Sequence, residues 1–204
     1  VDGAIPGMIF NSVSKDLYDG KKGIQVVPCA YLRQYVEWVP RDSGKGGAPV
    51  NIFPATSDIL SRTSKHPDDS KDYLDNGNYI ENTATFYVLV IHSEGYTTPV
   101  VISMKSTQLK KARKWNTMMM STKMRGTDGS FFTPPMYSQI YRLTSQAESN
   151  NKGKWYGWEI ERVGPIENVK IYQDAKSFAQ KVSAGDVNVK HDSEFVETDS
   201  TTPF

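Results

Sequence analysis

Residues 83–92 constrain the fold of this chain more than any other stretch, because apolar side chains recur there with a period of two. That period places alternate side chains on opposite faces of a β-strand. A turn at Ser93-Glu94-Gly95 follows, and a second apolar run occupies residues 99–104. The pattern predicts an antiparallel hairpin and a fold built mainly from β-structure. One face of the first strand would carry Ala84, Phe86, Val88 and Val90, and the other Thr85, Tyr87, Leu89 and Ile91.

The segment before this hairpin predicts further strands and a long connection. Residues 24–39 are rich in β-branched and aromatic side chains, and Pro28 marks a bulge, an edge or a bend. Residues 8–13 are a candidate partner strand across the intervening turn. Residues 41–82 lack apolar periodicity and are interrupted by Gly and Pro, so we expect a long excursion with a short helix near residues 57–61.

The segment after the hairpin predicts two helices and a second hairpin. Residues 106–124 and residues 167–184 carry helical apolar stripes, and Gly185 stops the second helix. Between them, residues 136–144 and 154–162 predict strands joined by the polar turn QAESNNKG. The expected stripes are Leu109, Ala112, Asn116, Met119 and Met120 in the first helix, and Val169, Tyr172, Ala175, Phe178 or Ala179, and Val182 in the second.

The order of these elements predicts a mainly β, α+β fold. It fits a five-stranded, OB-like Greek-key barrel with a helix between strands three and four, the place where residues 106–124 fall. A chain of 204 residues needs only one domain. We expect residues 1–185 to form it, with a C-terminal helix, followed by a disordered acidic tail at residues 186–204.

Several classes of protein are disfavoured by composition. The single cysteine, Cys29, excludes an intrachain disulfide and a cysteine-based zinc site. The longest apolar run, residues 86–91, is far shorter than the roughly 20 residues that span a bilayer. The first residues lack the pattern of a signal peptide. We therefore expect a cytoplasmic protein that does not contact membranes.

The strongest charge signal is a basic run. Residues 105–125 hold seven Lys and Arg side chains and no acid. On the expected helix, four of these bases would form a positive patch opposite the apolar stripe, with no acid at i,i+4 to neutralise it. A solvated helix face is the plain alternative.

Aromatic residues lie among and after these basic side chains. Aromatic rings stack on the exposed nucleobases of single-stranded nucleic acid, and each stacked nucleobase contributes about 1 to 3 kcal/mol, while Lys and Arg side chains contact the phosphates. Each ring has the alternative of lying in the core. The candidate DNA-binding residues are therefore Lys105, Lys110, Lys111, Arg113, Lys114, Trp115, Lys123, Arg125, Phe132, Tyr137, Tyr141, Lys154, Trp155 and Trp158.

The sequence supports catalysis less well than it supports nucleic-acid binding. GKGG at residues 44–47 lacks the spacing of a P-loop, and the three histidines have no metal-ligand spacing. Four aspartates at residues 68–75 lack the pattern of a calcium loop, so a solvated acidic loop is the expected reading. We expect no enzymatic activity, no metal and no cofactor.

The last residues, HDSEFVETDSTTPF, are acidic and rich in Ser and Thr. Residues 186–204 hold five acids and one lysine, so this tail carries −4 while residues 1–185 carry +5. The tail resembles the acidic tails of bacterial single-stranded-DNA-binding proteins, which finish in Pro-Phe, and those of T7-type phages. Its tail motif residues are Glu197, Asp199, Pro203 and Phe204; STT stands where a continuous Asp run would be.

Stretches such as ISMKSTQLKKARKWN, DNGNYIE and NKGKWYGWEI extend this resemblance to the phage-encoded single-stranded-DNA-binding proteins of T7-like viruses. The resemblance implies an OB-fold, sequence-tolerant binding of single-stranded DNA in replication, recombination and repair, and location in the host-cell cytoplasm. It also implies a tail that binds DNA polymerase and primase-helicase. A homodimer is left open. The alternatives are a virion or assembly protein and a metal-dependent nuclease that uses the acidic loop.

Overall fold

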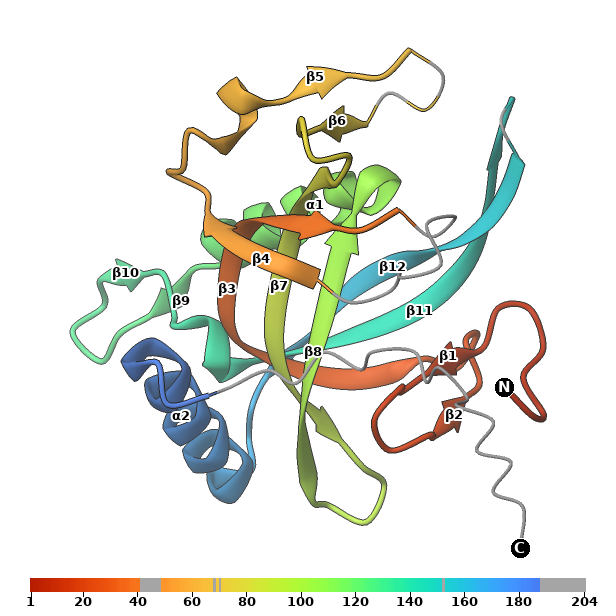
Figure 1. The fold of residues 1–204 in the computed structure, drawn as a ribbon. Helices are drawn as coiled ribbons and strands as arrows, with labels where there is room; N and C mark the ends of the chain where they lie inside the picture. Colours follow the sequence, from red (N-terminus) through yellow and green to blue (C-terminus); the bar gives the residue numbers. More distant parts are fainter. Residues whose placement is uncertain (41–48, 68, 70, 152, 188–204) are drawn as a thin grey trace, which may run out of the picture. The chain divides into compact units, whose positions relative to one another are not determined.

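The computed structural model describes residues 1–40, 49–67, 69, 71–151 and 153–187 (Figure 1). Residues 1–34 and 82–187 form one compact unit, and residues 35–81 form a second. Two long strands, β3 (Ile24–Trp38) and β7 (Tyr79–Ile91), run through both units. The expected tail at residues 186–204 lies almost wholly outside the described residues.

The first unit contains a curled antiparallel sheet, a half-barrel, in the order β12-β11-β3-β7-β8 (Figure 1). Strands β7 and β8 (Thr97–Lys105) pair with Ala84 opposite Met104, which confirms the predicted hairpin. Strands β11 (Gln139–Asn150) and β12 (Gly153–Pro165) form the second hairpin. Their pairing extends to Asn150 and Gly153, so most of the expected polar turn is strand. The fold is mainly β, with two helices.

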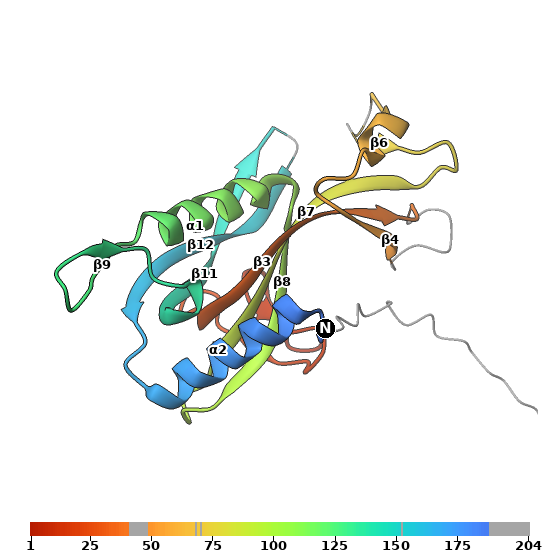
Figure 2. The same cartoon turned by 90° about the vertical axis from the view of Figure 1, so that its left-hand side faces the viewer.

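Two small sheets complete this unit. Strand β1 (Ile9–Phe10) pairs with β2 (Leu17–Tyr18), so the expectation that residues 8–13 pair with residues 24–39 is wrong. Strand β9 (Met124–Arg125) pairs with β10 (Phe131–Phe132) in a hairpin that projects from the end of helix α1 (Figure 2).

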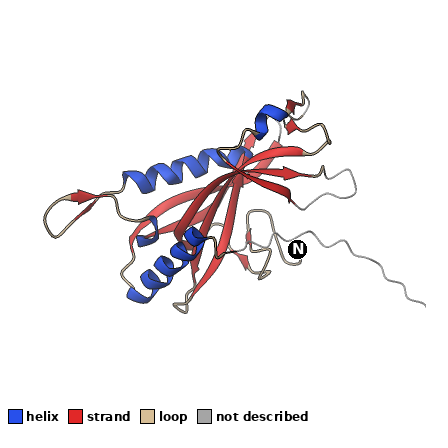
Figure 3. Ribbon diagram, turned by 60° about the vertical axis from the view of Figure 1, so that its left-hand side comes forward, coloured by secondary structure: helices blue, strands red, loops and turns tan. Residues whose placement is uncertain are grey.

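The helices lie on opposite faces of the curled sheet (Figures 2 and 3). Helix α1 (Leu109–Ser121) buries Ala112, Trp115 and Met119, so Asn116 and Met120 do not belong to its buried stripe. Helix α2 (Val169–Ala184) buries Ile171, Ala175 and Ala179, which confirms Ala175 and Ala179 of the expected stripe, whereas Val169 is exposed and Ile171 was not expected. The buried side of each helix is therefore as expected, but single positions are misassigned, because neighbouring positions satisfy a helical period about equally well.

The ends of α2 are explained by its sequence. The side chain of Asn168 accepts hydrogen bonds from the backbone N–H groups of Lys170 and Ile171, at 2.9 and 3.2 Å. Gly185 ends the helix in the left-handed conformation, with φ at 79°. This confirms the predicted stop.

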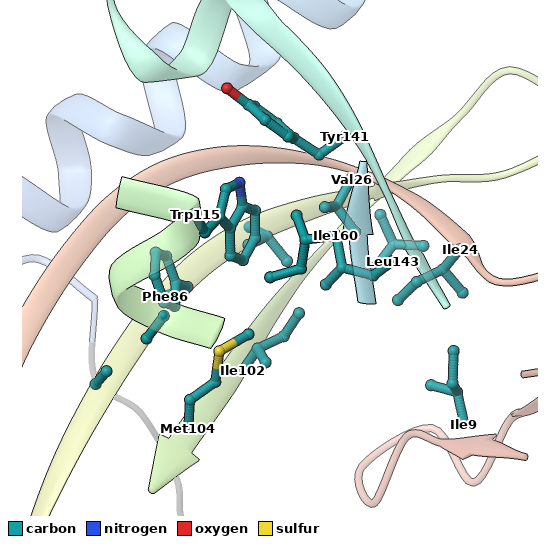
Figure 4. Close-up of a cluster of buried hydrophobic side chains, with 14 of the residues drawn as sticks. Ile9, Ile24, Val26, Phe86, Ile102, Met104, Trp115, Tyr141, Leu143 and Ile160 are labelled. Atoms are coloured by element: carbon teal, nitrogen blue, oxygen red, sulfur yellow. The ribbon is translucent and has the colours of Figure 1, made fainter. Parts of the chain in front are cut away.

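The core beneath α1 centres on Trp115 (Figure 4). Its ring stacks on Phe86 with centroids 4.3 Å apart, and meets Tyr141 edge-on at 5.7 Å. A second cluster beneath α2 contains Val27, Cys29 and Leu89. Because both faces of the sheet are covered, both faces of the alternating stretch at residues 83–90 are buried.

The second unit contains the rest of the sheet pairings. Strand β4 (Pro49–Pro54) pairs with β3, and β5 (Ser64–Lys65) and β6 (Asp72–Tyr73) follow β7. A short 3-10 helix, Ile59–Arg62, lies near the expected position. No helix among the residues that the structure describes is long and apolar enough to cross a membrane.

A buried carboxylate holds the second unit together. The side chain of Glu37 is 3% exposed and accepts hydrogen bonds from the amides of Asn51, Asn76 and Asn78 at 2.7, 3.2 and 2.6 Å. Burial alone would raise the pKa of Glu37, but these donors and the nearby Arg62 hold it below its ordinary value. The charge is therefore kept in the folded state.

Candidate nucleic-acid interface

The outer face of α1 presents exposed Lys and Arg side chains. Because Ala112, Trp115 and Met119 face the core, side chains offset from them by about half a turn face outward. Beyond the helix, Lys123 lies just before β9 and Arg125 lies within it, and both are exposed. We call this set the cationic strip; it consists of Lys110, Arg113, Lys114, Lys123 and Arg125. No acid interrupts the sequence along it.

Two of the helix bases are neutralised, which corrects the expectation that the patch has no acid partners. Lys111 Nζ lies 2.8 Å from Glu148 Oε1 and 3.2 Å from Glu159 Oε2, and Lys114 Nζ lies 2.6 Å from Glu159 Oε1. The two acids belong to β11 and β12, which pack beside α1. Lys110 and Arg113 form no ion pair with another described residue, so they carry the unpaired charge of the helix.

These ion pairs shift the pKa of each partner. Glu148, which accepts hydrogen bonds from Lys111 and Trp155, has its pKa lowered, and the ammonium of Lys111 has its pKa raised. The pKa of Glu159 is lowered by Lys114 and then by Lys111. All of these groups remain charged near neutral pH.

The strip leads into an aromatic hairpin. We call residues 123–133 the Phe finger, because Phe131 and Phe132 at its second strand are 73% and 44% exposed. Its turn is fixed by the Asp128 carboxylate, which accepts hydrogen bonds from the N–H and the hydroxyl of Ser130 at 3.0 and 2.7 Å. Gly129 adopts φ of 83° within it. The finger projects away from the sheet (Figure 2).

Two aromatic residues that the sequence predicted to bind DNA lie in the core instead. Trp115 and Tyr141 are fully buried in the core beneath α1, so neither ring is available to a base. Tyr137 lies in a 3-10 helix, Met136–Ser138, and contacts Tyr172 of α2 with centroids 5.9 Å apart. These rings stabilise the fold.

The remaining candidates lie elsewhere in the first unit. Lys105 ends β8, and Lys154 is exposed near the start of β12. Trp155 is half-buried and donates its Nε1–H to Glu148 at 2.9 Å. The tail motif residues lie outside the described residues. Sequence reasoning did not select Phe131, although its position beside Phe132 in a Gly-containing polar loop was the available signal.

Trp158 lines two neighbouring cavities. One has a volume of about 170 Å³ and the other about 210 Å³, and both are also lined by Ile9 and Phe10. The backbone N–H of Trp158 donates to Gln108 Oε1 at 2.9 Å, which ties β12 to the residue before α1. Trp158 is half-buried and packs against the core.

The described aspartates of the acidic loop contact neighbouring side chains. Asp69 Oδ2 accepts a hydrogen bond from the Tyr73 hydroxyl at 3.0 Å, and Asp72 lies 3.8 Å from Lys65 Nζ. Within the described residues, no three His, Cys, Asp or Glu side chains are grouped to hold a metal ion. Asp68 lies outside the described residues.

The curled sheet, the cationic strip and the Phe finger define a β-rich protein with a basic, aromatic-ended surface. Residues 1–188 match the model of the Pam3 phage gp34-like protein family, and the chain belongs to this family. The family is a phage family, which agrees with the phage origin expected from the sequence. No curated protein and no solved structure matches the chain.

Proposed function

We propose that this phage protein binds single-stranded DNA without sequence preference during DNA replication, recombination and repair. The observation that carries the proposal is the exposed cationic strip, whose Lys110 and Arg113 form no ion pair with a described residue, and which leads into the exposed Phe131 and Phe132. Phosphates of one strand would follow the unpaired Lys110 and Arg113 toward Lys123 and release their counterions. Bases at the end of that path would stack on the finger's rings.

The proposal includes an OB-type assignment of the half-barrel. Its support is the order of the long elements: three strands, β3, β7 and β8, precede α1, and two strands, β11 and β12, follow it. That order is the one of a five-stranded barrel with a helix between strands three and four.

The proposal also includes a role for the acidic tail. Residues 186–204 carry −4, and residues 1–185 carry +5. A peptide of that charge would compete with DNA for the cationic strip and weaken binding at low salt. When DNA displaces it, Phe204 and its acidic neighbours would be presented to a polymerase or primase-helicase.

The first test measures the anisotropy of a labelled poly-thymidine oligonucleotide, and of a matching duplex, at several salt concentrations. A label on the DNA is preferable to tryptophan fluorescence because Trp115 is buried. We expect the single strand alone to bind tightly, with affinity that falls as salt rises. Absence of binding at low salt, together with large homo-oligomers, would instead favour the assembly-protein alternative.

The second test locates the surface. The double variant Lys110→Ala with Arg113→Ala should lower the slope of log affinity against log salt by about 1.4, since each phosphate contact on a single strand contributes about 0.7. The matched control removes two exposed lysines of α2, Lys176→Ala with Lys181→Ala, and changes net charge equally. Equal slopes for the two double variants would exclude the strip as the DNA path.

A third test separates stacking and the tail. Phe131→Ala with Phe132→Ala should weaken binding by roughly 1 to 3 kcal/mol per stacked base while the salt slope stays unchanged. Deletion of residues 192–204 should tighten binding at low salt and abolish polymerase recruitment. If the deletion alters neither property, the tail has no part in the function.

A further inference from the structure

A second cationic site lies where β2, β3, β7 and β11 meet. It is an open pocket of about 550 Å³, and no residue of the cationic strip lines it. Its charged and polar lining includes Lys22, Gln25, His92 and Arg142, with Tyr18 at the wall. No Asp or Glu is among its lining residues. The pocket therefore carries two positive charges and no acid in its lining. Asp19, which accepts hydrogen bonds from the N–H groups of Lys21 and Lys22 and interacts with the Lys22 charge, lies outside the lining.

Close backbone packing fixes Lys22 beside β11. Gly23 has φ of 72°, and a Cβ on it would lie 2.2 Å from the carbonyl oxygen of Leu143. Three residues earlier in the same loop, the carbonyl of Gly20 accepts a hydrogen bond from the N–H of Ser145 at 2.8 Å. The loop thus lies directly on β11, which also carries Arg142. Only glycine permits this approach at residue 23.

The register of the β-strands places Gln25 and Arg142 next to each other. Arg142 of β11 is paired with Gln25 of β3, and Leu143 is paired with Ile24. Because Ile24 and Leu143 belong to the core beneath α1, Gln25 and Arg142 project from the opposite face of the sheet. The Arg142 guanidinium and the Gln25 amide therefore present hydrogen-bond donors side by side.

His92 is oriented before any ligand arrives. Its Nε2 lies 2.9 Å from the Thr98 hydroxyl, and its ring stacks on Tyr96 with centroids 4.2 Å apart and planes within 10°. With Nε2 engaged, Nδ1 is the ring nitrogen that has no hydrogen-bond partner among the described residues. Glu94 is the nearby acid, but it does not line the pocket.

We propose that this pocket binds a phosphate monoester of nucleotide size. Arg and Lys are the side chains that bind phosphate oxygens most directly, Arg as a two-pronged donor and Lys as a point charge. The volume lies within the range of small-molecule sites. Glu161 is the cross-strand neighbour of Arg142 on β12, yet within the described residues the two form no ion pair. The guanidinium therefore remains available to an anionic ligand.

The same phosphate chemistry has two sources, a free nucleotide or the 5′ end of a DNA strand. Calorimetric titrations of the full chain should therefore use four probes: inorganic phosphate, thymidine 5′-monophosphate, and a thymidine oligonucleotide with and without a 5′-phosphate. Binding of the monophosphate alone would identify a free nucleotide as the ligand. Tighter binding of the phosphorylated oligonucleotide than of its 5′-hydroxyl form would identify a strand end. Either result supports the phosphate site.

Substitutions test whether the phosphate-bearing probes bind in this pocket. Arg142→Gln and Lys22→Gln should each weaken binding of the phosphate-bearing probe at least tenfold, whereas Lys176→Gln on α2 should not. Because all three side chains are exposed, the fold should tolerate each change. The proposal is overturned if inorganic phosphate and thymidine 5′-monophosphate fail to bind at millimolar concentration while the 5′-phosphorylated and 5′-hydroxyl oligonucleotides bind equally. Equal weakening by Lys176→Gln would also overturn it. The 5′-hydroxyl oligonucleotide reports on the cationic strip separately, so failure of one site is distinguishable from failure of the other.

Discussion

Replacing Lys111 by methionine should destabilise the fold by about 1 to 2 kcal/mol. The side chains of Lys111 and Glu148 are only 22% and 24% exposed, and that of Glu159 is 38% exposed. Exposed ion pairs contribute up to about 1 kcal/mol each, so two contacts of intermediate burial give this range. The loss stays below the 3 to 5 kcal/mol typical of a broken buried pair. Glu148 keeps its hydrogen bond from Trp155, and Glu159 keeps its ion pair with Lys114.

The effect should depend on pH in a defined direction. The pKa values of Glu148 and Glu159 lie below their ordinary value of 4.5 in the folded state, so their contribution is present above pH 4.5 and is lost as pH falls through the folded values. The pKa of Lys111 lies above its ordinary value of 10.5, so its contribution is complete below that pH. Wild type and Lys111→Met should therefore differ at pH 7 and converge as pH falls well below 4.5.

Urea denaturation followed by far-ultraviolet circular dichroism measures this difference. Lys110→Met is the matched control, because it removes the same charge from the adjacent residue, which is exposed. We expect the control to change the free energy of unfolding by less than about 0.5 kcal/mol. The reasoning is refuted if the two variants are equally stable at pH 7, or if the Lys111→Met deficit does not shrink at any pH below 4.5 at which the wild type remains folded.

Three further predictions concern buried groups. Trp115→Ala should cost about 3 to 5 kcal/mol in urea denaturation, because it empties the site stacked on Phe86; Trp115→Phe should cost less, since it keeps a ring there and removes an N–H that has no acceptor among the described residues. Burial raises the pKa of Cys29 to about 12, so a thiol reagent at pH 8 should react with it only after denaturant unfolds the chain. Glu37→Gln should destabilise the second unit by about 1 to 3 kcal/mol at pH 7, because an amide cannot accept from three amide donors as a carboxylate does. Since the pKa of Glu37 is lowered in the folded state, that deficit should shrink as pH falls well below 4.5, and a deficit independent of pH would contradict the assignment.

Local patterns were sufficient to predict the main elements of the first unit. The alternation at residues 83–92 gave the β7–β8 hairpin, and Gly185 gave the end of α2. The same patterns predicted the buried side of each helix but not every buried residue, because they left out Trp115 in α1 and Ile171 in α2. In α1, the true stripe runs through Trp115. A tryptophan flanked by Lys114 in a basic run has the local features of a nucleic-acid-binding ring, and only its contact with the distant Phe86 shows that it belongs to the core.

The charge of the candidate surface was also only partly predictable. The absence of acids at i,i+4 along α1 is a correct reading of the helix by itself. The carboxylates that reach Lys111 come from Glu148 and Glu159, 37 and 48 residues later in the chain. Their proximity depends on how β11 and β12 pack against the helix. The pocket around Lys22 and Arg142 was missed for the same reason, since its residues converge only through strand pairing.

The ion pairs of α1 also bear on how its unpaired charges are directed. Lys111 and Lys114 tie one side of the helix to β11 and β12, while Trp115 ties the adjacent side to the core. With two sides fixed, rotation of α1 about its axis is restricted, and Lys110 and Arg113 are held toward solvent. The acids that neutralise half of the helix's charge thus position the other half. A variant that breaks the Lys111 contacts should therefore weaken the proposed DNA binding, because Lys110 and Arg113 would no longer be held in place, even though Lys111 itself is paired.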